Sequence, residues 1–506
     1  MKSHSYWERW TAAIRDRFRG STTGPQPGLH TYPLHLDGGQ RRLHLRIHPD
    51  GTGMLFVDVT DVIHLNPTAA HMAWMALERI PLARAQRQLY RHYRGVKRRE
   101  LADAAKRIYA MVDRLRDQAG ACPVCAIASE VQFQPLFSLP ARAPYKVDFA
   151  LTYACNNNCP HCYNEPERFT MRPLDKDDAF RVIDKLVAIG VPHLILTGGE
   201  PTLYPWLLEL VHYADQRGLI VGMNTNGRRL ARPTLARDLA EAGLNHVQIT
   251  LEASQAEVHD AMVGVAGAFH ETVAGIKNAL SAGLLTITNT TLTRQNQHLA
   301  LETIAFLHEL GLTTFAMNGI IHAGGGLYTP DAIPAEDMYA LLAAIRDTAD
   351  ELKMRFLWYT VTDYCQLSPL ELGLDPKRCN AGEYSMCIEP NGDVLPCQSY
   401  YVSVGNILRD PWDSIWNSDL FLRFRNRGRH PKESGLPEKC WNCPDLPVCG
   451  GGCPLEHEAL AAGSTIERAS ERGCGRASGR ALVRRPTQSS EPEKLLFFVH
   501  TDSRMP

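Results

Sequence analysis

The sequence predicts an α/β protein in which a parallel sheet or barrel stands between a small α+β domain and a loop-rich, cysteine-rich C-terminal region. Strand-like and helix-like segments alternate from residue 145 to about 355, which is typical of a parallel sheet or barrel. Residues 30–118 place strands before helices, and the 14 cysteines are unevenly distributed. A length of 506 residues also suggests more than one domain.

Composition excludes several classes of protein. The chain has 54 Lys and Arg against 55 Asp and Glu, so no global charge points to nucleic acid or to a membrane surface. The start, "MKSHSYWERWTAAIRDRF", lacks the apolar run of a signal peptide, and no stretch of 18 apolar residues exists. We therefore expect a cytoplasmic protein whose clustered cysteines bind metal rather than form disulfides.

The N-terminal region is predicted to be a helix and linker (1–29) followed by a compact domain (30–118). "TYPLHL", "RRLHLRIH" and "GMLFVDV" alternate as half-buried strands do, and "HPDGTG" predicts a hairpin turn. Asn66 and Pro67 predict the start of a helix, and two more helical runs follow. This order, with "LNPTAAHMAW" at the junction, resembles the winged-helix-like PqqD domain. The resemblance implies that a leader peptide binds as an added edge strand; the alternative is a small helical packing domain.

A connector (119–144) carries Cys122 and Cys125 in "ACPVCA". Two thiolates need two further ligands to hold a metal ion, so the role of this pair stays open. The next segment (145–355) contains six predicted strands and five predicted helices: 175–189, 205–217, 233–242, 268–282 and 298–310. Its polar and glycine-rich residues follow the strands, where barrels of this kind place their chemistry.

Three cysteines, Cys155, Cys159 and Cys162, follow the first of these strands in "CNNNCPHC". Three thiolates leave one coordination position open, which indicates catalysis or substrate binding. A [4Fe–4S] cluster with one free iron fits this spacing better than zinc does. The loop resembles that of the radical S-adenosylmethionine (SAM) enzymes, which have a partial (β/α)6 TIM-like barrel. The resemblance implies that SAM takes the free iron and that the reduced cluster cleaves SAM to a 5′-deoxyadenosyl radical.

Three further strand ends support the resemblance: "LTGGEP", "NTNG" and "ITLEAS". Many relatives carry "HDxxRG" after the fourth strand, whereas this chain has "HDAMVG" with Val263 in place of the arginine; another cation, such as Arg294, would then meet the SAM carboxylate. The resemblance implies SAM contacts from Gly198, Gly199, Glu200, Pro201, Asn224, Asn226, Thr250, Glu252 and Arg294.

A second cysteine array lies in the predicted C-terminal domain (356–480), ahead of a tail (481–506) expected to be disordered. Its spacing resembles the SPASM extension of radical SAM proteins, which implies two further [4Fe–4S] clusters with structural or electron-transfer roles. Two Cys₄ zinc sites are the alternative. Cys365 lies outside the array and is a candidate hydrogen-atom donor. The implied ligand sets are Cys379, Cys387, Cys397 and Cys453, and Cys440, Cys443, Cys449 and Cys474.

These domains in this order resemble enzymes that mature ribosomally made peptides. The resemblance implies SAM and three [4Fe–4S] clusters as cofactors. It also implies a precursor peptide as partner and an external electron donor of the flavodoxin or ferredoxin type. Cross-linking, thioether formation and epimerisation of the peptide all stay open. Two alternatives remain: a radical SAM enzyme acting on a small-molecule cofactor or tetrapyrrole precursor, and a non-enzymatic zinc or peptide-binding scaffold.

Overall fold

The structure is a computed structural model that describes residues 24–36, 39–57, 61–117, 132–133, 137, 141–461 and 497–500. These residues belong to two compact units. The first contains the described residues up to 137 together with 187–192 and 497–500, and the second contains 141–186 and 193–461. The predicted helix near the N-terminus, Cys122, Cys125 and Cys474 lie outside the described residues.

The first unit is built on a sheet of six strands in the order β1-β2-β3-β4-β15-β5. From β1 to β4, each strand pairs antiparallel with the next strand in the sequence. In the predicted hairpin turn between β2 and β3, the His48 amide donates to the Thr52 carbonyl at 2.8 Å. Three strands were predicted before the helices, but β4 is a fourth; it was missed because no Gly or Pro lies between β3 and β4 to mark a turn. The strands are β1 (Gly28–Leu36), β2 (Gly39–Ile47), β3 (Gly53–Val57), β4 (Asp61–Leu65), β5 (Gln132–Phe133) and β15 (Phe497–His500).

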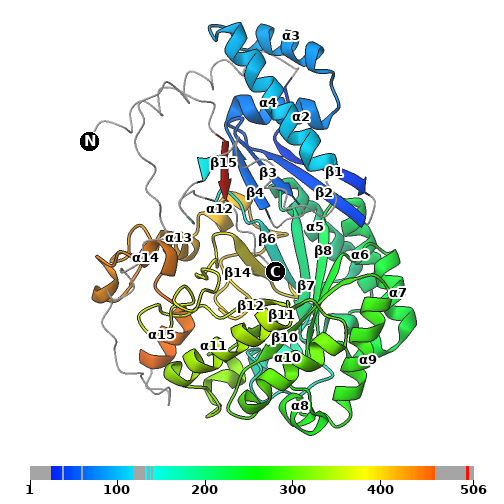
Figure 1. The fold of residues 1–506 in the computed structure, drawn as a ribbon, viewed down its shortest axis with the longest axis vertical. Helices are drawn as coiled ribbons and strands as arrows, with labels where there is room; N and C mark the ends of the chain where they lie inside the picture. Colours follow the sequence, from blue (N-terminus) through cyan, green and yellow to red (C-terminus); the bar gives the residue numbers. More distant parts are fainter. Residues whose placement is uncertain are drawn as a thin grey trace. The chain divides into compact units, whose positions relative to one another are not determined.

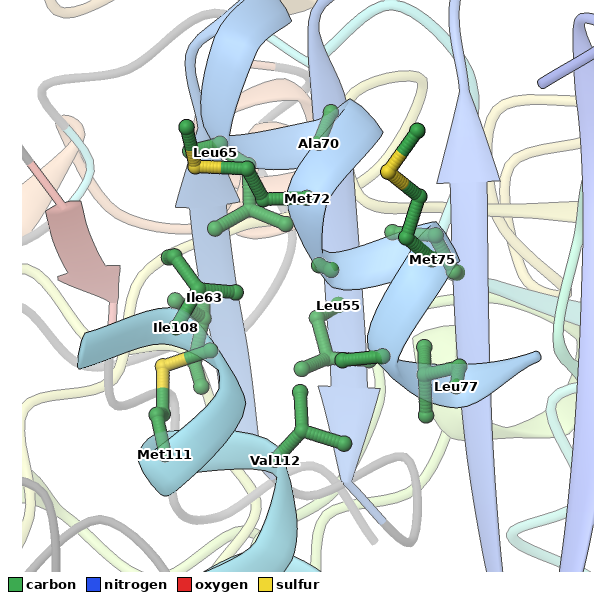
Figure 2. Packing of buried hydrophobic residues seen from close by; sticks show 14 of the residues in the cluster. Leu55, Ile63, Leu65, Ala70, Met72, Met75, Leu77, Ile108, Met111 and Val112 are labelled. Carbon is green, nitrogen blue, oxygen red and sulfur yellow. The ribbon is translucent and has the colours of Figure 1, made fainter. Parts of the chain in front are cut away.

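Three helices cover this sheet, as predicted: α2 (Pro67–Leu77), α3 (Leu82–His92) and α4 (Arg98–Asp117). The side chain of Asn66 caps α2 by accepting from the Ala69 amide at 2.8 Å. Aliphatic and methionine side chains from β3, β4, α2 and α4 point toward one another and form the core (Figure 2). The labelled members are Leu55, Ile63, Leu65, Ala70, Met72, Met75, Leu77, Ile108, Met111 and Val112.

The second unit contains a nine-stranded sheet in the order β12-β11-β10-β9-β8-β7-β6-β13-β14 (Figure 1). Neighbours from β12 to β13 are parallel, and only β13 and β14 are antiparallel. The α/β class with a parallel, barrel-like sheet is thereby confirmed. The strands are β6 (Lys146–Thr152), β7 (His193–Gly198), β8 (Ile220–Thr225), β9 (His246–Thr250), β10 (Leu285–Thr291), β11 (Thr314–Asn318), β12 (Arg355–Trp358), β13 (Ser385–Ile388) and β14 (Val394–Leu395).

Helices connect the parallel strands. All five predicted helical runs are present, but α8, α11 and the seventh strand, β12, were missed. The helices are α5 (Lys176–Ile189), α6 (Leu207–Gln216), α7 (Pro233–Glu241), α8 (Ala256–Val263), α9 (Ala268–Ser281), α10 (Ala300–Glu309) and α11 (Ala335–Glu351).

The region after β12 consists mostly of loops and short elements, as predicted. It contains α12 (Trp412–Trp416), α13 (Asp419–Asn426), α14 (Leu446–Cys449) and α15 (Pro454–Ala461). Short 3-10 helices lie at η3 (Pro166–Thr170), η4 (Pro201–Leu203), η5 (Arg228–Ala231), η6 (Gln297–Leu299), η7 (Gly324–Leu327) and η8 (Glu438–Cys440). None of the helices in the described part of the chain is long and apolar enough to cross a membrane.

A histidine pair at the amino ends of β7 and β9 predicts a pH-dependent stability. The Nε2 atoms of His193 and His246 lie 2.9 Å apart, and burial, with a smaller effect of Lys146, lowers the pKa of His246 to about 4. The unfolded chain therefore binds more protons below about pH 6.5. We expect the contribution of His246 to the free energy of unfolding to be fully present above pH 6.5. This contribution should fall by about 3 kcal/mol as the pH drops from 6.5 through 4.

Denaturation across this pH range, compared between the wild type and His246→Asn, checks the expectation. The variant should show a shallower loss of stability between pH 6.5 and 4. His308→Asn, which replaces an exposed histidine in α10, serves as the matched control and should keep the wild-type slope. Equal slopes for all three proteins would contradict the prediction.

Candidate functional site

The three-cysteine loop follows β6 and brings its thiols close together. Burial raises the pKa of the Cys155 thiol to about 11, and the charges of Glu200 and Cys162 add to this effect. The pKa of Cys159 is raised by burial and then by Glu252, Cys162 and Cys155. Thiolates that repel one another in this way need a positively charged group between them. The donor set therefore fits an iron–sulfur cluster, and these three cysteines would hold it.

Glycines let neighbouring segments contact the loop backbone. The Gly199 amide donates to the Thr152 carbonyl at 2.7 Å, and a Cβ on Gly199 would lie 2.5 Å from the Tyr153 and Ala154 carbonyl oxygens. The Gly325 amide donates to the Cys162 carbonyl at 2.7 Å, and a Cβ there would lie 2.2 Å from the Pro160 oxygen. Gly198 and Gly199 were predicted as SAM contacts, whereas Gly325 was missed, although the run "GGG" after the sixth strand was a visible signal.

Glu200 joins the ends of β7 and β8. Its side chain is completely buried, and its oxygens accept from the Thr202 amide at 3.0 Å, from the Thr225 hydroxyl at 2.8 Å and from the Asn226 amide at 2.8 Å. Pro201 begins η4 directly after it. In the structure, this carboxylate orders two strand ends beside the cluster loop.

Asn226 contacts the cluster loop directly, because its Nδ2 donates to Asn156 Oδ1 at 2.7 Å. Asn224 lies two residues earlier, in β8, and its side chain takes no part in this hydrogen bond. Of the two asparagines predicted to bind SAM, the structure thus brings Asn226 to the loop.

Glu252 contacts the cluster loop from the other side. Its Oε1 lies 3.2 Å from His161 Nε2, its Oε2 accepts from the Thr291 amide at 2.7 Å, and its side chain is 1% exposed. Burial lowers the pKa of His161, but the hydrogen bond and charge of Glu252 outweigh it, so the net pKa is raised. Glu252 was expected to face the ribose; its contacts here position the loop. Thr250, the last residue of β9, lies opposite Asn289 of β10.

Arg228, which was missed, is a cation that touches the cluster loop. Its Nη1 donates to Asn157 Oδ1 at 3.0 Å and to the Asn156 carbonyl, and its Nε donates to Glu271 at 2.6 Å. Arg294, which is predicted to meet the SAM carboxylate, is exposed, and its Nε donates to the Ala332 carbonyl at 3.2 Å; its role toward SAM stays a prediction. The sequence signal for Arg228 was its position immediately after "NTNG".

Several C-terminal cysteines interact with one another, while their division into two cluster ligand sets stays a prediction. The pKa of Cys397 is raised most by burial, then by the charge of Cys379 and, more weakly, by that of Cys453. The pKa of Cys387 is raised by burial and also by the charge of Cys397. The pKa of Cys440 is raised by burial to about 11, with contributions from Cys449 and Cys443. Within the described residues, no three His, Cys, Asp or Glu side chains lie close enough to hold a single metal ion.

The neighbours of Cys365 lie beside the second of these groups, because the Tyr364 backbone hydrogen-bonds to the Cys449 thiol and Asp363 interacts with Cys440 and Cys449. The predicted role of Cys365 as a hydrogen-atom donor stays a prediction. Asp363 accepts from the Cys365 amide at 3.0 Å and pairs with Lys439 at 3.1 Å.

A buried polar network links the cluster loop to the first C-terminal group. Tyr153 donates to Glu389 at 3.1 Å, Arg168 also donates to Glu389, and the Arg168 guanidinium lies 3.9 Å from the centre of the Tyr401 ring. The Tyr401 hydroxyl donates to Asn164 at 2.9 Å. Tyr153 and Tyr401 pack in one apolar cluster with Cys387, so this network fixes the loop relative to the C-terminal cysteines.

The site predicts contrasting effects for two glycines that share a left-handed backbone. A Cβ on Gly264 (φ 69°) would lie 2.4 Å from the Asn158 carbonyl oxygen in the cluster loop, whereas a Cβ on Gly267 (φ 80°) meets nothing within 4 Å. Gly267→Ala should lower the free energy of unfolding by about 1 kcal/mol through backbone strain alone. Gly264→Ala should cost a further ~1–3 kcal/mol because the loop must shift.

Chemical denaturation of both variants, together with their iron content, measures this difference. Gly264→Ala should also bind less iron, since its clash displaces the loop that carries the three cysteines. Equal losses of stability and unchanged iron in the two variants would show that Gly264 does not support the loop.

The parallel sheet and the cysteine loop at the end of β6 together define an iron–sulfur enzyme with a barrel-like core. Residues 149–318 match the radical SAM superfamily, and residues 379–444 match the iron–sulfur cluster-binding domain called SPASM. The chain belongs to the radical SAM superfamily and carries the SPASM domain.

Named relatives include enzymes with different substrates. The AdoMet-dependent heme synthase of Methanosarcina barkeri is 30% identical over 61% of this chain and 91% of that protein. The PqqA peptide cyclase of Rhodopseudomonas palustris is 30% identical over 63% of this chain and 84% of that protein. The crystal structure of Streptococcus suis SuiB bound to precursor peptide SuiA aligns with a TM-score of 0.57 and 16% identity, covering 85% of this chain and 97% of that one. This likeness shows a shared fold.

Proposed function

We propose that this enzyme modifies a ribosomally synthesised precursor peptide. When bound, SAM and a reduced [4Fe–4S] cluster supply a 5′-deoxyadenosyl radical that removes an unactivated hydrogen atom from the substrate. Cys155, Cys159 and Cys162 hold that cluster, while Glu252, Arg228 and Gly325 position their loop. A flavodoxin or ferredoxin is the proposed electron donor.

One observation carries the peptide assignment. In the first unit, β1 to β4 form an antiparallel sheet covered by three helices, and its core is separate from the unit that holds the cysteines. On the side away from β3, β4 pairs through its backbone with a single neighbouring strand, and an extended peptide can pair with β4 in that position. A leader bound in this way tethers the rest of the peptide at a high effective concentration near the cluster. The peptide cyclase relative supports this assignment.

The test is the intact mass of short peptides encoded beside this protein, after co-expression under low oxygen in ordinary and deuterated water. Loss of two hydrogens per event would indicate an oxidative cross-link or thioether. Deuterium gain without any other mass change would indicate epimerisation. Unmodified peptides with continued SAM cleavage would refute the proposal.

A small-molecule substrate is the second candidate, and the heme synthase relative favours it. The two candidates differ in what they require of the first unit. β3 lies between β2 and β4, so the proposed leader position is the one on the other side of β4. Ile63→Pro in β4 should abolish peptide modification, whereas turnover of a small molecule should survive it.

A further inference from the structure

The strand position beside β4 has an occupant from the same chain. β15 pairs antiparallel with β4, so that Phe497 lies opposite Leu65 and His500 opposite Val62 (Figure 1). These residues come from the end of the sequence, more than 400 positions after β4. The position beside β4 is the one that the proposed function assigns to a leader peptide.

β15 is an internal strand of the sheet and not its edge. Its other side pairs parallel with β5, where Phe498 meets Gln132 and Val499 meets Phe133. Neighbouring strands lie about 4.8 Å apart, so the space between β4 and β5 is one strand wide. A peptide that pairs with β4 in this space must therefore displace β15.

The tail sequence suits a reversible competitor. "RRPTQSSEPEK" (484–494) is polar and contains two prolines, and "LLFFVH" (495–500) is apolar and rich in residues that favour strands. A polar tether keeps the apolar segment at a high local concentration, and only the short strand itself has to be exchanged.

We propose that β15 is a built-in substitute for the leader strand and that it regulates access of the precursor peptide to β4. The inference rests on the proposed function, because it concerns the same strand position. The incoming partner is an extended peptide segment with apolar, strand-favouring residues, which pairs with β4 through main-chain hydrogen bonds. Its affinity for the full chain is lowered by the fraction of molecules in which β15 is docked.

The pairing itself is tested by hydrogen exchange without any substrate. Three chains are compared: the full protein, a deletion of residues 491–506 that removes β15, and a deletion of 501–506 that keeps it. In an antiparallel pair, alternate residues point their amides at a given neighbour. We expect alternate amides of Asp61–Leu65 to exchange at least roughly tenfold faster in the first deletion only. Equal exchange in all three chains would overturn the inference.

The regulation is tested by modification of the precursor peptide. If β15 is docked roughly nine-tenths of the time, deleting 491–506 should lower the apparent KM for the peptide about tenfold and leave kcat unchanged. Val499→Pro in the full chain should do the same, since Val499 is paired on both sides and proline has no amide to donate. Adding a synthetic peptide of residues 491–506 to the deleted chain should raise its KM back to that of the full chain.

The two proposals fail in different ways. Equal KM values for the full and the deleted chain would overturn the regulation, even with peptide modification intact. If no chain modified any peptide, the proposed function would fail, while the exchange pattern at β4 would still decide the pairing.

Discussion

Replacing Cys159 with alanine is expected to abolish SAM cleavage. The residue lies in the loop after β6, where its thiol interacts electrostatically with Cys155 and Cys162. Two thiolates cannot hold a four-iron cluster with a single open iron, so the SAM-binding position is lost. Formation of 5′-deoxyadenosine, measured by chromatography after reduction with dithionite, should fall at least about 10³-fold.

The same variant contains its own control. The two proposed C-terminal clusters lie outside the loop, so about eight of the proposed twelve irons should remain, with the visible absorption of fully ligated clusters. Cleavage of SAM at wild-type rates would refute the assignment of Cys159. Loss of all iron would mean that the variant failed to fold, and Cys159→Ser would then repeat the test with a closer match in shape.

Replacing Cys397 with alanine should separate SAM cleavage from product formation. Cys397 interacts with Cys379 and Cys453, and Cys387 with Cys397, so these four thiols are assigned to one cluster. Its loss should remove about four irons and leave 5′-deoxyadenosine formation in place. An oxidative modification of the peptide should stop, because the electron left on the product has lost its acceptor. Iron content, 5′-deoxyadenosine and peptide mass are the three measurements.

Double variants test how the cysteines are grouped. Cys397→Ala with Cys453→Ala should lose no more iron than Cys397→Ala alone, since both residues serve one cluster. Cys397→Ala with Cys443→Ala should lose about eight irons, because two clusters are affected. If the Cys397/Cys453 double variant lost as much iron as the Cys397/Cys443 double variant, the assignment of the two ligand sets would be wrong.

The sequence predicted much of the fold because hydrophobic periodicity and turn residues are local signals. Asn66 capped its helix as predicted, and the five expected barrel helices are present. β4 was missed because no Gly or Pro separates it from β3. The order of strands in space is a long-range property, so neither the pairing of β13 with β6 nor that of β15 with β4 could be inferred from periodicity.

The residues of the candidate site were also predictable only in part. Cysteine spacing is a direct chemical signal, and the predicted ligand sets include described thiols that interact electrostatically in the structure. Contacts that depend on side-chain direction were harder to predict. Arg294 turns toward Ala332, whereas Arg228 reaches the loop, and no pattern in the sequence distinguishes the direction of two arginines that both follow strands.

The pairing of β13 with β6 has a consequence for how the protein is made on the ribosome. β6 is the first strand of the parallel sheet to be synthesised, six of its seven residues are buried, and one of its two sides is paired only by Ser385–Ile388. Until those residues emerge, the nascent chain exposes an apolar strand edge of the kind that templates aggregation. A recombinant fragment that stops before residue 385 will carry this exposed edge permanently. Expression of the intact chain should therefore benefit from an ample supply of chaperones.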